Sequence, residues 1–308
     1  MSASLSNVTP TLVDLAQAPP EFDPAAYRAL HSDLWYLDDA ALAAHYERAG
    51  RAEGRRAHPI ATREAFRDLA ATAGRILEIG PFFRPLCVGP NVRYFDILDR
   101  EGLLRKAEGH GFFGVAPPEI DFVSADGDLG IVQETFDVVL SSHAIEHQPD
   151  LVAHLQQVER LLAPGGCYFL FVPDKRFCLD HFMPESTIAD VLEAAMERRR
   201  RHTLRTVVRH DTMQAHNDSF RHWQGDHGEP LHLDADGIAA AMEEFARGAA
   251  SGEYLDRHAW QFTPRSFRAI LELLNALGMV RLAPFRVFDT LAGHNEFWAI
   301  LRTPDPAP

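Results

Sequence analysis

The segment RILEIGPFFRP, residues 75–85, joins a short apolar run to a glycine turn. The run around Glu78 is typical of a strand that is buried on both faces of a parallel sheet. Gly80 follows directly, and glycine allows the backbone to approach a ligand at the carboxyl end of such a strand. Asp96, after the next apolar run, is spaced to accept hydrogen bonds from ribose hydroxyls. The segment therefore predicts a nucleotide-type cofactor site.

Helical and strand patterns alternate after this segment. The run around 136–143 is almost continuously apolar, and residues 150–166 place Leu151, Leu155 and Val158 on one helical face. Regularity returns at 263–278, where Thr263 can cap a helix, and two strand patterns, 282–290 and 295–302, follow. This alternation predicts an α/β fold with a mainly parallel sheet wrapped by helices.

Changes in composition predict four parts. Residues 1–20 are predicted to be a disordered tail, 21–60 a small helical unit, 61–302 the main domain and 303–308 a second tail. The main domain carries an insertion or lid at 175–260, which is too long for one crossover.

The small unit resembles a segment found beside many bacterial glycosyltransferase and polysaccharide-modification domains. The matching residues are Phe22, Asp23, Tyr27, Asp33, His45, Tyr46, Gly50, Glu53, Gly54 and Arg55. A plain helical hairpin and a docking site for a protein partner are both open interpretations of this unit.

Composition restricts the function classes. The formal net charge of −14 disfavours nucleic acid as a partner. The run 198–201 of four arginines is interpreted as a solvated helix end. No apolar run approaches the ~18 residues of a membrane helix, so no membrane insertion is expected. An odd count of three cysteines and no visible signal peptide fit reduced thiols and a cytoplasmic location.

Five motifs follow the predicted elements in the order of class I S-adenosylmethionine-dependent methyltransferases, which the chain resembles over 65–175 and more loosely over 262–302. The resemblance implies a Rossmann-like, doubly wound, mainly parallel seven-stranded sheet with an antiparallel edge strand, and S-adenosyl-L-methionine as the cofactor. The residues that the motifs place at the cofactor are Glu78, Gly80, Pro81, Asp96, Ile97, Asp126, Gly127, Ser142 and His143.

The family pattern assigns roles to these positions. It implies that Glu78 lies near the methionine amino group, that Asp96 binds the ribose hydroxyls beside an adenine contact at Ile97, and that Asp126 lies near the adenine amino group. The glycine turn departs from the family, because Gly80 is followed by proline and phenylalanine instead of further glycines. This departure disfavours an NAD-type oxidoreductase, since a pyrophosphate needs the second glycine. It leaves open a non-catalytic methyltransferase-like module that docks in polysaccharide assembly.

The insertion is rich in histidine, with six between 202 and 232. Because an imidazole suits a general base near neutral pH, His216, His222 and His227 are the candidate catalytic residues, with His147 a weaker one. Their spacing matches no tight zinc pattern, so no metal site is predicted. The EIGPF variant of the first motif resembles a bacterial branch linked to sugar modification. The expected reaction is therefore O-methylation of a small polar acceptor, a sugar or glycan-related hydroxyl.

Overall fold

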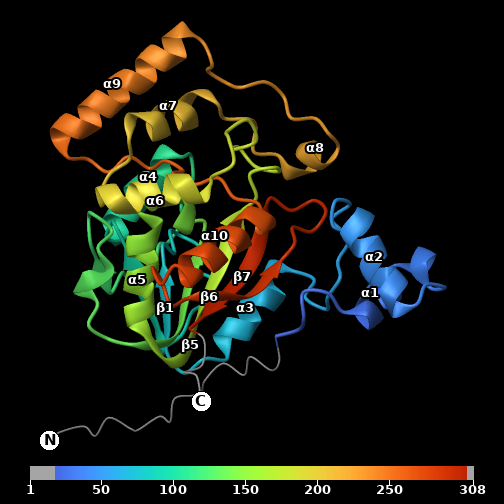
Figure 1. Ribbon diagram of the computed structural model, residues 1–308. Helices are drawn as coiled ribbons and strands as arrows, with labels where there is room; N and C mark the ends of the chain where they lie inside the picture. The colour runs from blue at the N-terminus through green and yellow to red at the C-terminus, as the bar shows by residue number, and fades with distance from the viewer. Residues whose placement is uncertain (1–17, 304–308) are drawn as a thin grey trace, which may run out of the picture.

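The computed structural model describes residues 18–303. Residues 1–17, most of the predicted tail 1–20, lie outside the described residues, as do residues 304–308 of the tail predicted at 303–308. Figure 1 shows a central sheet flanked by helices, with the insertion across its top and the N-terminal helices to one side. Ala18 is already buried, and the carbonyl of Pro19 accepts a hydrogen bond from Arg286 at 2.9 Å.

The sheet has seven strands in the order β3-β2-β1-β4-β5-β7-β6. The pairs from β3 through β5 are parallel, and β7 pairs antiparallel with both β5 and β6. The fold is therefore the predicted Rossmann-like, mainly parallel sheet, with the antiparallel strand second from the edge. The strands are β1 (Ile76–Ile79), β2 (Val92–Asp96), β3 (Phe122–Val123), β4 (Phe136–Ser142), β5 (Leu162–Pro173), β6 (Ala283–Phe288) and β7 (Glu296–Arg302).

The strand order reverses next to β1, and this places the site. Ile79 at the end of β1 pairs with Phe95 on one side and Ser141 on the other. The carboxyl ends of β1, β2 and β4 therefore lie side by side. In open α/β sheets such a switch point is where ligands bind.

Helices cover both faces of the sheet. One apolar core joins the sheet to α5, α6 and α10, and the other joins it to α3, where Phe66 stacks on Trp298 with ring centroids 5.6 Å apart. The helices of the main domain are α3 (Arg63–Ala71), α4 (Arg100–Gly109), α5 (Leu151–Leu161) and α10 (Pro264–Ala276), with short turns η4 (Leu129–Ile131) and η5 (Ile145–His147). Thr263 caps α10 by accepting from the Ser266 amide, as predicted.

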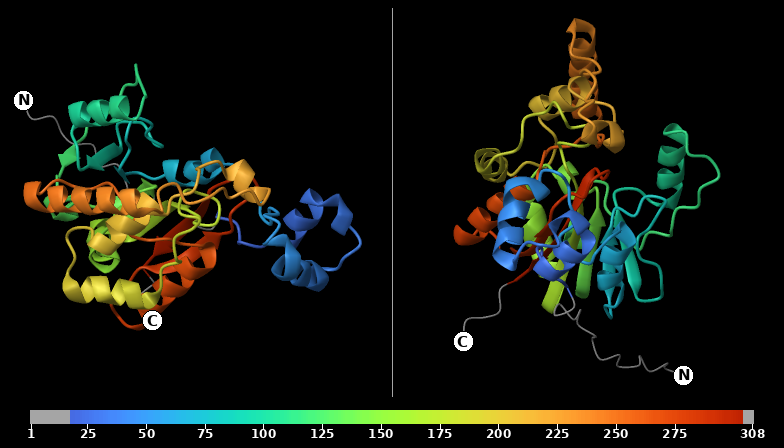
Figure 2. Two further views of the ribbon diagram at one scale, coloured as in Figure 1. Left: turned by 90° about the horizontal axis from the view of Figure 1, so that it is seen from above. Right: turned by 90° about the vertical axis from the view of Figure 1, so that its right-hand side faces the viewer.

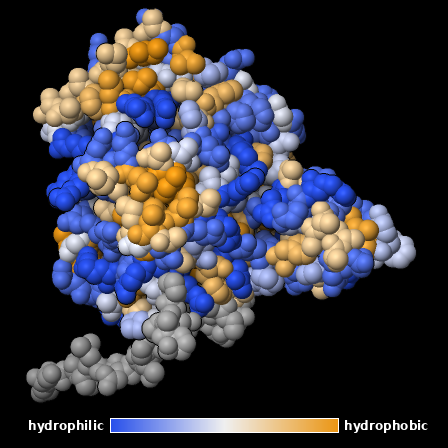
Figure 3. Space-filling view, in the orientation of Figure 1, coloured by the Kyte–Doolittle hydropathy of each residue, from blue (hydrophilic) through white to orange (hydrophobic). Residues whose placement is uncertain are grey.

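The insertion contributes four helices that lie over the carboxyl ends of the strands (Figures 1 and 2). They are α6 (Ile188–Glu197), α7 (Leu204–Thr212), α8 (Ser219–Trp223) and α9 (Ala235–Ser251). In the space-filling view, apolar side chains gather over α9, where Met242 is exposed (Figure 3). After α9, residues 252–260 form a segment without regular secondary structure, the strap, which leads back from the insertion to the main domain (Figure 1).

The N-terminal unit projects from the main domain (Figure 2). It consists of α1 (Pro24–Leu30), η2 (Ser32–Leu34), α2 (Asp39–His45) and the π-helical turn η3 (Tyr46–Gly50). It has its own small apolar core, centred on Tyr27 and Leu42. Gly50 is needed for close packing, because a Cβ there would lie 2.0 Å from the Tyr27 hydroxyl. Tyr46 and Arg51 both contact Asp289, which joins the unit to the main domain.

Among residues 18–303, no helix is long and apolar enough to span a membrane. The three cysteines are buried and unpaired in the same part of the chain.

Candidate functional site

A cavity of about 240 Å³ lies at the carboxyl ends of β1, β2 and β4. Of the nine predicted cofactor residues, six line it: Gly80, Asp96, Ile97, Gly127, Ser142 and His143. His147, predicted as a weaker catalytic candidate, lines it as well. The apolar walls include Ile79, Phe82 and Leu129. The cavity therefore brings together residues from four of the predicted motifs.

The turn after β1 adopts the left-handed conformation twice. Gly80 has φ +72°, and Phe82 has φ 49° without being glycine. Left-handed backbone is costly for a residue with a side chain and concentrates at functional sites. A Cβ on Gly80 would meet the Ala144 side chain at 3.5 Å. Phe82 thus takes the place of a further glycine in this turn, and its ring forms one wall of the cavity.

Glu78, within β1, stabilises the loop that follows this turn. Its carboxylate accepts hydrogen bonds from the amides of Leu86 and Cys87, at 2.8 and 3.0 Å. Burial raises the pKa of Glu78 to about 7, against the lowering effect of these two bonds. Neither Glu78 nor Pro81 lines the cavity, and Pro81 is buried. In this structure the Glu78 carboxylate holds the proline-rich loop in place.

Asp96 ends β2 with its carboxylate at the cavity. It is 8% exposed and accepts one hydrogen bond, from the Leu98 amide at 3.2 Å. Burial raises the pKa of Asp96, while Lys106 nearby opposes this effect. A largely desolvated carboxylate with free acceptor positions suits a diol, whose two hydroxyls can each donate to it.

The third predicted acid lies outside the cavity. Asp126 is exposed, and its carboxylate accepts from the Ser124 hydroxyl at 2.7 Å. It lines a neighbouring hollow instead, whereas Gly127, with φ +71°, reaches the cavity wall through its backbone. The backbone of this turn therefore approaches the cavity more closely than its acid.

The strap covers the cavity from the insertion side. Tyr254 and Asp256 both line it. The Asp256 carboxylate lies 2.7 Å from the Lys106 ammonium of α4 and 3.0 Å from Nδ1 of His147. Burial would raise the pKa of Asp256, but His147 and Lys106 outweigh it and hold this pKa well below its usual range. The strap is thereby fastened to both α4 and the end of β4.

His143, directly after β4, is oriented by a buried carboxylate. Its Nε2 lies 2.8 Å from Oε2 of Glu296 on β7. Burial would raise the pKa of Glu296, but the bond to His143 and the nearby Arg63 lower it to about 2. Because an ionised carboxylate only accepts, the proton of a neutral His143 resides on Nε2 and its lone pair on Nδ1. His143 also has φ 49°, a strained value for a side-chain-bearing residue.

An open hollow of about 490 Å³ shares His143 with the cavity. Its other lining residues are almost all polar: Thr62, Arg63, Glu64, His294, Asn295 and Glu296. Hydroxyl, amide, imidazole and carboxylate groups can hydrogen-bond a polyhydroxylated molecule. The imidazole of His143 therefore stands between the partly apolar cavity at the strand ends and a more open polar hollow.

The predicted catalytic histidines His216, His222 and His227 form a separate cluster with His181. The rings of His216 and His222 stack at 4.2 Å, and Nδ1 of His222 lies 3.0 Å from Nδ1 of His227. None of the three lines the cavity at the strand ends. Helix α8, which carries His222, contacts a residue that lines the hollow, because Trp223 donates a hydrogen bond to the carbonyl of His294 at 2.8 Å.

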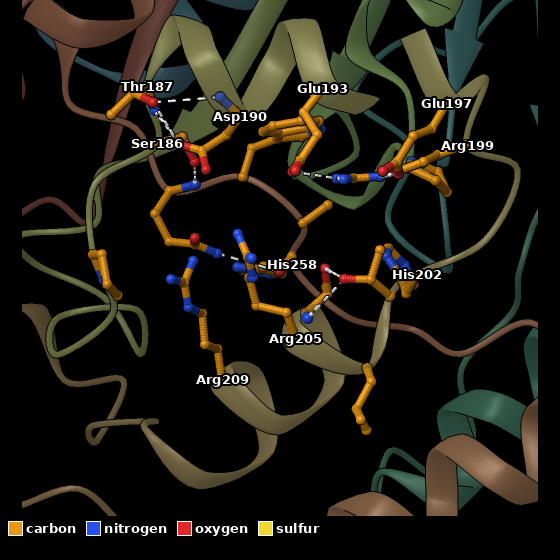
Figure 4. Close-up of a pocket in the computed structure, with 18 of the residues that line it drawn as sticks. Ser186, Thr187, Asp190, Glu193, Glu197, Arg199, His202, Arg205, Arg209 and His258 are labelled. Carbon is orange, nitrogen blue, oxygen red and sulfur yellow. Dashed lines mark hydrogen bonds and ion pairs between the residues drawn. The ribbon is translucent and has the colours of Figure 1, made fainter. Parts of the chain in front are cut away.

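A further cavity of about 560 Å³ lies between α6, α7 and the strap. Figure 4 shows His258 near its centre, with Arg205 and Arg209 of α7 around it. Arg199, from the predicted basic run, forms ion pairs with Glu193 and Glu197 at the same rim. Arg199 is therefore neutralised by carboxylates at the end of α6.

Several site residues were not predicted from the sequence. No motif quoted for the family contains Glu296, Asp256, Tyr254 or Lys106. Lys106 comes from α4, which directly follows β2, whereas the other three reach the site from elements far along the chain. One feature of the sequence could have pointed to Glu296, because it is an acid at the start of a mostly apolar strand. Such an acid is costly to bury unless it has a partner.

The comparisons with known proteins point to a methyltransferase domain. Residues 95–170 match the family model described as a methyltransferase domain. A curated relative, described as a probable phthiotriol/phenolphthiotriol dimycocerosates methyltransferase 2 from Mycobacterium ulcerans (strain Agy99), is 40% identical over 73 residues, 23% of this chain. The chain spans 28% of the length of that relative.

Two solved structures are similar at a lower level. The CcbJ methyltransferase from Streptomyces caelestis aligns over 79% of this chain and 88% of its own, with a TM-score of 0.41 and 11% identity. An S-adenosylmethionine-dependent methyltransferase from Clostridium acetobutylicum ATCC 824 aligns over 86% and 99%, with a TM-score of 0.40 and 9% identity. Similarities of this size carry no argument about the activity of this chain.

The matched segment coincides with the cavity. It begins at the end of β2 and ends within β5, and so contains Asp96, Gly127, His143 and His147. The methyltransferase-domain match supports S-adenosyl-L-methionine as the cofactor, as the sequence predicts. The residues present fit that group, because the cavity offers a buried carboxylate at Asp96, apolar walls and a glycine turn.

Proposed function

We propose that the chain transfers a methyl group from S-adenosyl-L-methionine to a hydroxyl of a small polar acceptor, a sugar or glycan-related molecule. The observation that carries this proposal is the position of His143. Its side chain lines both the cavity that holds Asp96 and the polar hollow beside it. A cofactor in the first and an acceptor in the second would meet at this imidazole.

The residues around the junction have distinct tasks. Asp96 accepts hydrogen bonds from the ribose hydroxyls, and Gly80 lets the cofactor lie against the backbone. When bound, the cofactor supplies an electrophilic methyl group on a positively charged sulfur. His294 and Asn295 hydrogen-bond the acceptor in the hollow and hold one hydroxyl in line with the methyl carbon.

Proton removal falls to His143. As the acceptor oxygen bonds to the methyl carbon, the carbon–sulfur bond breaks and its electron pair stays on sulfur. The hydroxyl proton passes to Nδ1 of His143, because Nε2 is already engaged with Glu296. The ionised Glu296 then stabilises the imidazolium that forms, a carboxylate–histidine arrangement familiar from other general bases.

Transfer of a labelled methyl group tests this function. The protein is incubated with S-adenosylmethionine labelled on its methyl group and with separate panels of sugars, nucleotide-linked sugars and amines. We expect label in a sugar hydroxyl. Label in amines alone would contradict the acceptor class, and the absence of any transfer from a cofactor that binds would contradict the catalytic role.

A docking module is the second candidate function, and one observation favours it. The N-terminal unit presents Trp35 and Tyr36, which are 73% and 66% exposed, on a projecting part of the molecule (Figure 2). Exposed aromatic side chains are enriched at protein interfaces. If Trp35→Ala and Tyr36→Ala together abolish association with a glycan-assembly protein, and the chain neither binds the cofactor nor transfers methyl groups, this alternative holds.

A further inference from the structure

Glu146, in the η5 turn after β4, has a buried carboxylate that receives no hydrogen bond. Its exposure is 0%, and neither side-chain oxygen has a hydrogen-bond partner among the described residues. The amides of Ala259 and Trp260 bond only to its backbone carbonyl. An uncompensated charge in such a position costs several kcal/mol of stability. A cation close to the carboxylate would compensate this charge.

Three imidazoles lie near this carboxylate: Nδ1 of His143 is 3.8 Å from Oε1 of Glu146, and two more face the same oxygen at similar distances. Nε2 of His147 lies 3.7 Å and Nε2 of His258 lies 3.9 Å from Oε1 of Glu146. These distances are too long for hydrogen bonds. They are close to the spacing of metal ligands, because bonds of about 2.1 Å place two ligand atoms of a tetrahedral zinc ion roughly 3.4 Å apart. The ligand atoms of Glu146, His147 and His258 all lie within 4.8 Å of one another.

The opposite ring nitrogens of both imidazoles lie beside outer carboxylates. Nδ1 of His258 forms a hydrogen bond of 2.7 Å with Oδ2 of Asp180, which is 1% exposed, whereas Nδ1 of His147 lies 3.0 Å from Oδ1 of Asp256 without hydrogen-bond geometry. Because Nδ1 of His258 donates to Asp180, the lone pair of the neutral imidazole lies on Nε2, which faces Glu146. Metal-ligating histidines are characteristically held in this way by an outer carboxylate.

The geometry points to a metal site, in which His147, His258 and Glu146 bind one divalent first-row transition-metal ion. Two imidazoles and one carboxylate are a donor set that suits zinc. Sequence spacing could not reveal it, because Glu146 and His147 follow β4 whereas His258 lies in the strap. The second histidine cluster is less suitable, since the 3.0 Å contact between His222 and His227 already satisfies those two nitrogens as a hydrogen bond.

The position of the site indicates what the ion does. His147 lines the cofactor cavity, and His258 lines the cavity between α6 and α7 (Figure 4). An ion shared by these residues would fasten the strap to the end of β4, and the strap supplies Tyr254 and Asp256 to the cofactor cavity. Metal removal is therefore expected to weaken cofactor binding, a consequence that rests on the proposed function.

Metal binding is measured directly, without the cofactor. Untagged protein is stripped with a chelator and titrated with Co²⁺, followed by visible absorption, and with Zn²⁺, followed by calorimetry. We expect one equivalent to bind, with the intense absorption of tetrahedral Co²⁺. Glu146→Gln and His258→Gln should abolish it, and Asp180→Asn should weaken it by about 10- to 100-fold. The matched control His222→Gln, in the other cluster, should bind as the parent protein does.

Two results would overturn the metal site. One is the absence of stoichiometric binding to the parent protein, and the other is loss of binding in His222→Gln instead of His258→Gln. X-ray absorption at the zinc edge of the parent protein serves if a variant fails to fold, and it should show two imidazoles and a carboxylate. Calorimetry with S-adenosylmethionine then separates the two proposals, because metal bound without cofactor binding would contradict only the proposed function.

Discussion

Nε2 of His143, at the end of β4, lies 2.8 Å from Oε2 of Glu296, at the start of β7. The two residues are brought together because β5, between these strands, pairs with β4 in parallel and with β7 antiparallel. The end of one strand therefore meets the beginning of the other. This contact gives the site an oriented imidazole at the boundary of the cofactor cavity.

Replacing His143 tests its assignment as the base. His143→Gln and Glu296→Gln should each lower methyl transfer at saturating cofactor by about 10²- to 10⁴-fold, the range of general-base catalysis. Affinity for the cofactor should change little in comparison, and His110→Gln, an exposed histidine, is the control. The measurement is turnover with the acceptor found in the labelling panels. Unchanged turnover in His143→Gln would show that another group takes the proton, and His216, His222 and His227 would then be replaced in turn.

Because the turn after β1 is left-handed at Gly80, any residue with a side chain there should lower the stability of the protein. Gly80→Ala should lower the free energy of unfolding by roughly 1–2 kcal/mol, because φ +72° is unfavourable for alanine, and should weaken cofactor binding. Gly109→Ala is the matched control, since its Cβ would enter open space at the end of α4. Urea denaturation of both variants measures the effect. Equal stability of the two would contradict the strain assigned to this turn.

Replacement of Gly50 is predicted to destabilise the N-terminal unit and to leave the main domain unaffected. A Cβ there would lie 2.0 Å from the Tyr27 hydroxyl, so Gly50→Ala must displace a fully buried ring. Overpacking of this kind typically costs about 1–3 kcal/mol. Hydrogen exchange should become faster in residues 22–57 and stay unchanged in the main domain. Faster exchange throughout the chain would show that the unit is not a separate core.

The lowered pKa of the buried His154 predicts that the folded protein loses stability in mild acid. His154 is buried, its Nε2 lies 3.0 Å from the Tyr168 hydroxyl, and burial lowers its pKa from 6.5 to about 4. The unfolded chain therefore binds a proton below pH 6.5 that the folded protein binds only near pH 4. Stability falls as the pH drops through this window, by about 2 kcal/mol between pH 7.5 and pH 5 from this residue.

Urea denaturation at the two pH values isolates this contribution. His154→Gln should be less stable than the parent protein at pH 7.5, because it loses a well-packed ring. Its stability should nevertheless fall less steeply with decreasing pH. A variant whose stability falls by the same amount as that of the parent protein would show that other groups cause the acid sensitivity.

The sequence predicted the parallel core and part of the cavity lining. Gly80, Asp96 and His143 each lie at or just after the end of a strand that the apolar pattern identifies, and parallel strands bring their carboxyl ends to one edge. The predicted roles of Glu78 and Asp126 depended on side-chain direction within a turn, which spacing does not determine. In this structure the first binds the loop and the second is exposed.

The residues contributed by the strap and β7 could not be placed in the same way. Asp256 and His258 follow a long insertion whose path over the sheet depends on helix packing and not on strand periodicity. Glu296 meets His143 only through the antiparallel addition of β7. Composition alone directed attention to the histidine-rich segment around His222, although none of His216, His222 and His227 lines the cavity at the strand ends.

Cofactor binding at Asp96 is the most direct test of the central claim. Calorimetric titration with S-adenosylmethionine and with its demethylated product should give one site in the parent protein. Asp96→Asn should weaken it by roughly tenfold or more, because hydrogen bonds to a charged group are each worth about 1.5–3 kcal/mol. Asp68→Asn, at an exposed carboxylate on α3, should bind normally. Absence of binding to the parent protein, or equal affinity in Asp96→Asn, would contradict the assignment of this cavity to the cofactor.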